Sequence, residues 1–82
     1  MNNAAKLLDR MRANPRDWRI EDIIVVCDSH RIACTPPRNG SHYKVKHDTM
    51  AAILTIPARR SIKPVYIREL VRFIDTVQEL AS

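Results

Sequence analysis

A turn followed by a strand with alternating polar residues carries the side chains whose types and spacing could do chemistry. The segment Gly40-Ser41-His42 is followed by lysines at every second position, Lys44 and Lys46. Alternate side chains of a β-strand point to the same face. We therefore expect His42, Lys44 and Lys46 together on one face of a sheet, directly after the turn.

These residue types suit the cleavage of RNA. A histidine imidazole titrates near neutral pH, so His42 can accept or donate a proton. RNA supplies its own nucleophile, the 2′-hydroxyl, while Lys44 and Lys46 can hold phosphates. The Ser41 hydroxyl and the amides of the turn can bind a phosphate oxygen. No metal is then required. The alternative is a surface histidine without catalytic function, the commoner role of a histidine beside a turn.

The other chemically capable side chains have plainer interpretations. His47 is a second candidate at the far end of the same strand, on the opposite face, and His30 is interpreted as a cap at a helix end. Two cysteines, Cys27 and Cys34, are too few for a disulfide scaffold and fit no common zinc spacing. We expect them to be small apolar residues in a reducing compartment. The sequence shows no metal-ligand cluster, phosphate-binding glycine loop or nucleophile triad, so no cofactor is expected.

The composition favours a small basic domain with a polyanionic partner. The 82 residues suffice for one domain, and 14 Lys and Arg against 9 Asp and Glu give a formal charge of +5. Such an excess favours nucleic acid, with an acidic protein or a merely solubilising surface as alternatives. No segment is long enough for a membrane span, and the first residues lack the pattern of a signal peptide. A cytoplasmic location is expected.

Two helices are expected ahead of the turn. Apolar residues at helical spacing predict the first over residues 4–12, and Pro15 ends it. The second is expected from about residue 18 to 29. Trp18 should pack at the joint between them.

The second helix has a competing interpretation. Its apolar residues follow the stripe of a half-buried helix, with Asp17 as the expected cap and two carboxylates in the first turn. The unbroken run 23–27 is also typical of a buried strand. The capping pattern favours the helix.

Three strands and a last helix follow. The strands are expected over residues 32–35, 42–47 and 52–56, with Pro57 closing the third. A basic loop then contains Arg59, Arg60 and Lys63. Pro64 opens the last helix at a position where its missing N–H is tolerated. The apolar face of that helix is broader than one sheet needs, and we favour packing on the first helix over a partner surface.

The order helix, helix, strand, strand, strand, helix predicts an α+β fold. A two-layer sandwich satisfies it, with a three-stranded antiparallel sheet and the helices on one face. The Val45 side of the sheet should face the helices. His42, Lys44 and Lys46 should lie on the open face.

The segment from Gly40 to His47 resembles the glycine-serine-histidine strand of the HicA family of toxins. Residues 53–57 look like that family's second hairpin strand, which ends in proline. The basic loop resembles the one before its last helix, where Leu70 and Ile74 fall at core positions. The resemblance covers about residues 17–80 of a single domain over residues 1–82, and residues 1–16 form an additional helix and linker.

The resemblance implies a fold like a double-stranded-RNA-binding domain and the activity of an mRNA interferase. Such a protein is the endoribonuclease of a type II toxin–antitoxin system, and it implies a HicB-type antitoxin as partner. His42 is the implied catalytic residue. The residues expected to bind RNA are Gly40, Ser41, Lys44, Lys46, Arg59, Arg60 and Lys63.

Two departures from the family pattern leave alternatives open. Pro64-Val65 stands where the family's last helix usually opens with glycine and threonine, and His30-Arg31 stands where a glycine often ends the second helix. Neither departure removes His42. The alternatives are a non-catalytic RNA-binding module of the same fold and a protein-interaction domain.

Overall fold

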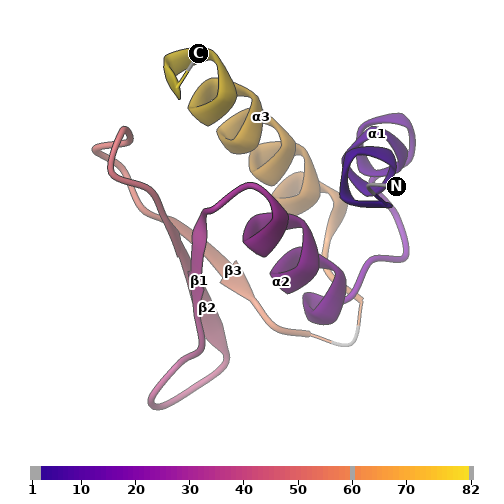
Figure 1. The fold of residues 1–82 in the computed structure, drawn as a ribbon. Coiled ribbons are helices and arrows are strands. Elements are labelled where there is room, and N and C mark those ends of the chain that lie inside the picture. Colours follow the sequence, from indigo (N-terminus) through magenta and orange to yellow (C-terminus); the bar gives the residue numbers. More distant parts are fainter. Residues whose placement is uncertain (1–2, 60, 82) are drawn as a thin grey trace.

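The chain folds into two layers, a sheet and three helices that lie on one side of it (Figure 1). The computed structural model describes residues 3–59 and 61–81. The elements in chain order are α1 (Asn3–Ala13), α2 (Ile20–Ser29), β1 (Ala33–Thr35), β2 (His42–Lys46), β3 (Leu54–Pro57) and α3 (Pro64–Ala81). The expected α+β class and element order are confirmed. Across the described residues, no helix has the length and apolarity needed to cross a membrane.

The sheet is an antiparallel meander in the order β1-β2-β3, with β2 at its centre. Within β2, Val45 is fully buried against the helices and Tyr43 is half-buried. His42, Lys44 and Lys46 alternate with them and are exposed. The expected direction of these side chains is therefore confirmed.

The segment after Trp18 is a helix, as the capping pattern favoured, and not a strand. It begins at Ile20, and the prediction that Asp17 caps it is wrong. Asp17 has a φ of 64°, in the left-handed region, so it lies in the linker before the helix. Arg19 occupies the N-cap position instead, and its backbone N–H donates to Oδ2 of Asp22 at 3.0 Å. A carboxylate three residues into the helix thus satisfies the entering chain.

The bounds of all three strands differ from the expected ranges. β1 begins at Ala33, one residue later than expected. β2 stops at Lys46, because His47 belongs to the following turn, where Nδ1 accepts the N–H of Thr49 at 3.2 Å. β3 begins at Leu54 and includes Pro57. Since β3 is an edge strand, proline is tolerated there despite its missing N–H.

Helix α1 is part of the core. It packs on both α2 and α3, beside α3 in Figure 1, and Leu8 and Met11 belong to the same buried cluster as Val45 and Ile74. The broad apolar face of α3 is therefore covered by α1, as expected, although Leu80 near its end stays exposed.

Trp18 fills the joint between α1 and α2, as expected. Its ring is buried, and Nε1 donates to the carbonyl oxygen of Asn14 at 2.7 Å. The guanidinium of Arg10 lies over the ring, 5.4 Å from its centroid. The Trp18 carbonyl accepts the N–H of Ile62 at 3.0 Å, which ties this linker to the loop before α3.

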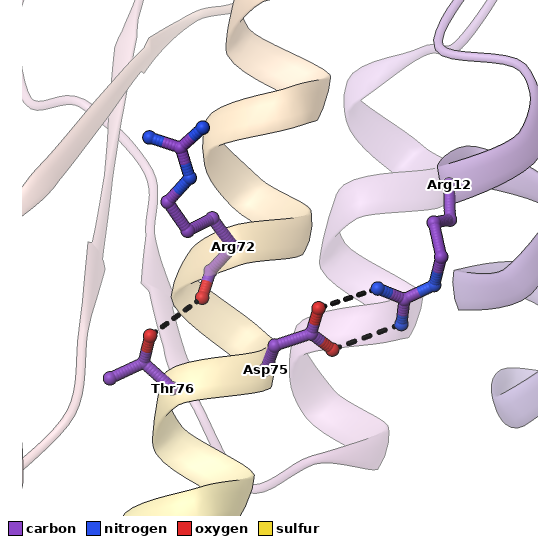
Figure 2. Close-up of polar contacts among 4 residues, drawn as sticks. All are labelled: Arg12, Arg72, Asp75 and Thr76. Atoms are coloured by element: carbon purple, nitrogen blue, oxygen red, sulfur yellow. Dashed lines mark hydrogen bonds and ion pairs between the residues drawn. The ribbon is translucent and has the colours of Figure 1, made fainter.

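An ion pair joins α1 to α3. Nη1 and Nη2 of Arg12 donate to the two carboxylate oxygens of Asp75 at 2.5 and 2.9 Å. The hydroxyl of the next residue, Thr76, donates to the Arg72 carbonyl one turn earlier in α3 (Figure 2). The hydrogen bonds from Arg12 hold the pKa of Asp75 below its ordinary value. The two side chains remain 48% and 33% exposed, so solvent screens the pair.

We expect Asp75→Asn to lower the free energy of unfolding at pH 7 by at most about 1 kcal/mol, because the pair is exposed. Since the pKa of Asp75 is lowered by folding, its contribution is complete above the ordinary carboxyl range, near pH 4, and is lost as the pH falls through the lowered pKa. Urea unfolding of wild type and variant at several pH values measures this. A difference that grows toward acid pH would contradict the assignment.

Candidate functional site

The turn before β2 is fixed by its backbone. Gly40 has a φ of 88°, a conformation that other residues adopt with strain, and no atom lies close to where its Cβ would stand. Glycine is thus required by the turn's conformation and not by crowding. The carbonyl of Ser41 accepts the N–H of Ala58 at 2.6 Å. This bond joins the turn that precedes His42 to the loop that follows β3.

A small cavity brings together residues from three parts of the chain. It has a volume of about 110 Å³ and is lined by His42, Pro57, Arg59, Lys63 and Tyr66. His42 comes from β2, where it pairs with Pro57 of β3. Arg59 comes from the loop after β3. Lys63 directly precedes α3, and Tyr66 lies in the first turn of α3. We call this space the His42 cavity.

Besides His42, the His42 cavity is lined by two charged side chains. Both are cations, Arg59 and Lys63. Within the described residues, neither makes a hydrogen bond or an ion pair through its side chain. The cavity also lies at the N-terminal end of α3, where the helix dipole favours negative charge. It is smaller than the roughly 300–1,000 Å³ of pockets that enclose whole small molecules. The arrangement therefore suits one anionic group of a larger ligand, such as a phosphate.

Two of the expected RNA-binding lysines lie outside this cavity. Lys44 and Lys46 are exposed on the same face of β2 as His42. One alternate position along a strand is about 7 Å, so Lys44 is a neighbour of His42 and Lys46 is about twice as far away. Lys46 lines a separate hollow beside the turn after β2, together with His47. Gly40 and Ser41 are exposed in the turn, and Arg60 lies outside the described residues.

The other two histidines have structural partners. His30 occupies the C-cap of α2, and its Nδ1 lies 2.7 Å from the carbonyl oxygen of Val26, which confirms its interpretation as a cap. Nδ1 of His47 lies 2.8 Å from the hydroxyl oxygen of Thr49, at the opposite end of β2 from His42. His42 shares its cavity with two cations and no carboxylate, whereas the hollow beside His47 contains Lys46 together with Asp48.

The two cysteines lie together in and beside the core. Cys27 is buried near the end of α2, Cys34 is half-buried on β1, and both are free thiols. The hydrogen bond with Cys34 and, secondarily, burial raise the pKa of the Cys27 thiol. A thiol with a raised pKa is a poor nucleophile, which supports a packing role for Cys27. Within the described part of the chain, no group of three or more His, Cys, Asp or Glu side chains is arranged to hold a metal ion.

Tyr66 lines the His42 cavity although it is not among the residues expected to bind RNA. Its side chain is half-buried. Its spacing offered a signal. Residues three apart on a helix lie on one side, and Tyr66 follows Lys63 by three residues, with its N–H bonded to the Lys63 carbonyl at 3.0 Å.

Comparisons of the chain with protein-family models, with curated proteins and with solved structures found no match. The resemblance of residues 17–80 to the HicA family therefore stays a prediction.

Proposed function

We propose that this chain is a HicA-type toxin, an endoribonuclease that cleaves messenger RNA in the cytoplasm without a metal. The observation that carries the proposal is the His42 cavity, in which a histidine lies with two unpaired cations, Arg59 and Lys63. Cleavage of RNA by its own 2′-hydroxyl requires both functions, proton transfer and stabilisation of a charged phosphate.

In the proposed mechanism the scissile phosphate enters the His42 cavity. The imidazole of His42 removes the proton of the 2′-hydroxyl while the 2′-oxygen attacks the adjacent phosphorus. The bond from phosphorus to the 5′-oxygen breaks, which leaves a 2′,3′-cyclic phosphate on one fragment. Arg59 and Lys63 stabilise the negative charge that develops on the phosphate oxygens. Because His42 is exposed, water can protonate the departing 5′-oxygen.

The surroundings of the cavity support a polymeric substrate. Lys44 continues the cationic surface along β2, and the formal charge of the whole chain is +5. A toxin of this kind requires a partner that suppresses it, and we propose a HicB-type antitoxin that covers the face carrying His42. An acidic partner would complement that charge.

Controlled expression in a bacterial host tests the proposed function. We expect induction of the wild-type chain to arrest growth and to shorten the lifetime of messenger RNA, measured by blotting of several transcripts. The control is His42→Ala, expressed to the same level, which should do neither. Equal toxicity of the two proteins would show that His42 is not the catalytic residue.

The two alternative functions predict other outcomes. A non-catalytic RNA-binding module would bind RNA in a salt-sensitive manner, with and without His42, and give no cleavage products. A protein-interaction domain would show no RNA affinity at physiological salt and would retain a protein partner in a pull-down. Either result would contradict the proposed endoribonuclease.

A further inference from the structure

A second cavity adjoins the first. It has a volume of about 320 Å³ and is lined by Arg19, Ile20, Glu21, Ala58 and Arg59. Arg59 therefore lines both cavities, and Ala58 donates its N–H to Ser41, the residue before His42. We call this second space the Arg19 cavity. The two cavities meet at the short segment that follows β3.

The charges of the Arg19 cavity favour an anion. Arg19 and Arg59 contribute two guanidinium groups against the single carboxylate of Glu21. Among residues 3–59 and 61–81, the side chain of Arg19 has no hydrogen bond or ion pair. The carboxylate of Asp22 accepts the backbone N–H of Arg19. The planar guanidinium of an arginine can donate two parallel hydrogen bonds to phosphate oxygens, so the unpaired Arg19 suits a phosphate.

Two backbone hydrogen bonds hold the cavities in fixed relation. The N–H of Ala58 bonds the Ser41 carbonyl at 2.6 Å, and the N–H of Ile62 bonds the Trp18 carbonyl at 3.0 Å. The loop after β3 is thereby attached to the turn before β2 on one side and to the linker before α2 on the other. A polymer with regularly spaced phosphates requires binding sites whose distance from each other is fixed, and these bonds fix the position of one cavity relative to the other.

The cationic surface does not extend equally in every direction. Another hollow, of about 510 Å³, lies between α1 and α2. Its two arginines, Arg10 and Arg16, are balanced by Asp17 and Asp22, and Arg10 is stacked over Trp18. Phosphate binding is therefore expected to end at Arg19.

We propose that Arg19 and Arg59 form a second RNA subsite, which binds a phosphate next to the one held in the His42 cavity. This inference rests on the proposed function, because it assumes that RNA occupies the His42 cavity. The ligand is one strand of RNA that runs from β2 across the segment after β3 to the start of α2. Arg19 is a binding residue and takes no part in the proton transfer.

The test measures RNA binding by fluorescence anisotropy in the His42→Ala background, where cleavage is removed. Labelled oligoribonucleotides of two and of ten nucleotides are compared over a range of salt concentrations. We expect Arg19→Ala to weaken binding of the longer RNA about fivefold at 0.1 M salt and to lower the salt slope by about 0.7, the value of one phosphate contact on a single strand. Binding of the dinucleotide should not change.

Matched variants separate the subsite from general charge. Lys6→Ala removes an exposed cation of α1 that lines none of the three cavities and should leave both affinities unchanged. Arg19→Lys keeps the positive charge but loses the paired N–H donors of the guanidinium, and it should restore the salt slope that Arg19→Ala lowers. Circular dichroism checks that the Arg19 variants fold.

The outcomes also distinguish this inference from the proposed function. Wild type that cleaves RNA while Arg19→Ala binds both RNA lengths normally would overturn the subsite alone. Failure of wild type to cleave, with the Arg19 dependence intact, would support the subsite and overturn the endoribonuclease. Loss of binding to a protein partner without loss of RNA binding in Arg19→Ala would overturn the subsite in favour of a protein surface.

Discussion

Replacing His42 with alanine is expected to lower the rate of RNA cleavage by about 10²–10⁴-fold, the contribution of a positioned acid or base. The side chain is exposed on β2 and makes no hydrogen bond within the described residues, so its loss should leave the fold and the melting temperature nearly unchanged. RNA affinity should persist, because Arg59 and Lys63 remain in the cavity. Single-turnover cleavage and anisotropy on the same RNA measure the two effects separately.

The matched control is His47→Ala, at the other end of the same strand. His47 bonds Thr49 in the turn and lines a hollow other than the His42 cavity. We expect this variant to keep the wild-type cleavage rate. Loss of cleavage in His47→Ala with a normal rate in His42→Ala would place the catalytic histidine in the turn between β2 and β3.

The largest expected effect on stability comes from a helix outside the HicA resemblance. Met11 of α1 is 1% exposed and belongs to the central buried cluster. Met11→Ala should lower the free energy of unfolding by about 2–5 kcal/mol, because it removes buried apolar surface and leaves a cavity. Small domains are stable by only about 5–15 kcal/mol in total. Urea unfolding should therefore show a large shift of the midpoint.

Met50→Ala serves as the comparison for this substitution. Met50 is a partly buried methionine at the edge of the core, in the turn after β2. Its truncation should cost distinctly less, since part of its surface already contacts water. A cost for Met11→Ala as small as that of an exposed side chain would mean that α1 is not an integral part of the core.

Local patterns predicted the elements of this fold well where burial has a clear period. The alternation along β2 predicted that Val45 is buried and that His42 and Lys44 are exposed, since a strand has two faces. The missing N–H of Pro64 predicted the start of α3. The helical stripe of α2 prevailed over its β-branched run because only one side of that segment is buried.

Features that depend on tertiary contacts could not be predicted in the same way. Asp17 has a residue type that often caps helices, but here it lies in the linker before α2, with a φ of 64°. The same linker is held to the loop before α3 by the hydrogen bond from the Ile62 N–H to the Trp18 carbonyl, and the helix begins only at Ile20. Arg19 has no motif of its own, and it lines a cavity with Arg59 because the loop after β3 passes the start of α2. Tyr66 lines the His42 cavity from the first turn of α3. The sequence singled out His42, Arg59 and Lys63 as candidates, but it could not show that the three line one cavity or that Tyr66 lies beside them.

In the proposed function, the His42 cavity uses the 2′-hydroxyl of RNA to cleave the adjacent phosphodiester. The most direct measurement incubates the purified protein, with EDTA present, with an oligoribonucleotide and with the same sequence carrying 2′-deoxyribose at every position. We expect fragments ending in a 2′,3′-cyclic phosphate from the RNA and no cleavage of the deoxy oligonucleotide. Cleavage of the deoxy oligonucleotide, or RNA fragments that end in a 3′-hydroxyl, would contradict the proposed mechanism.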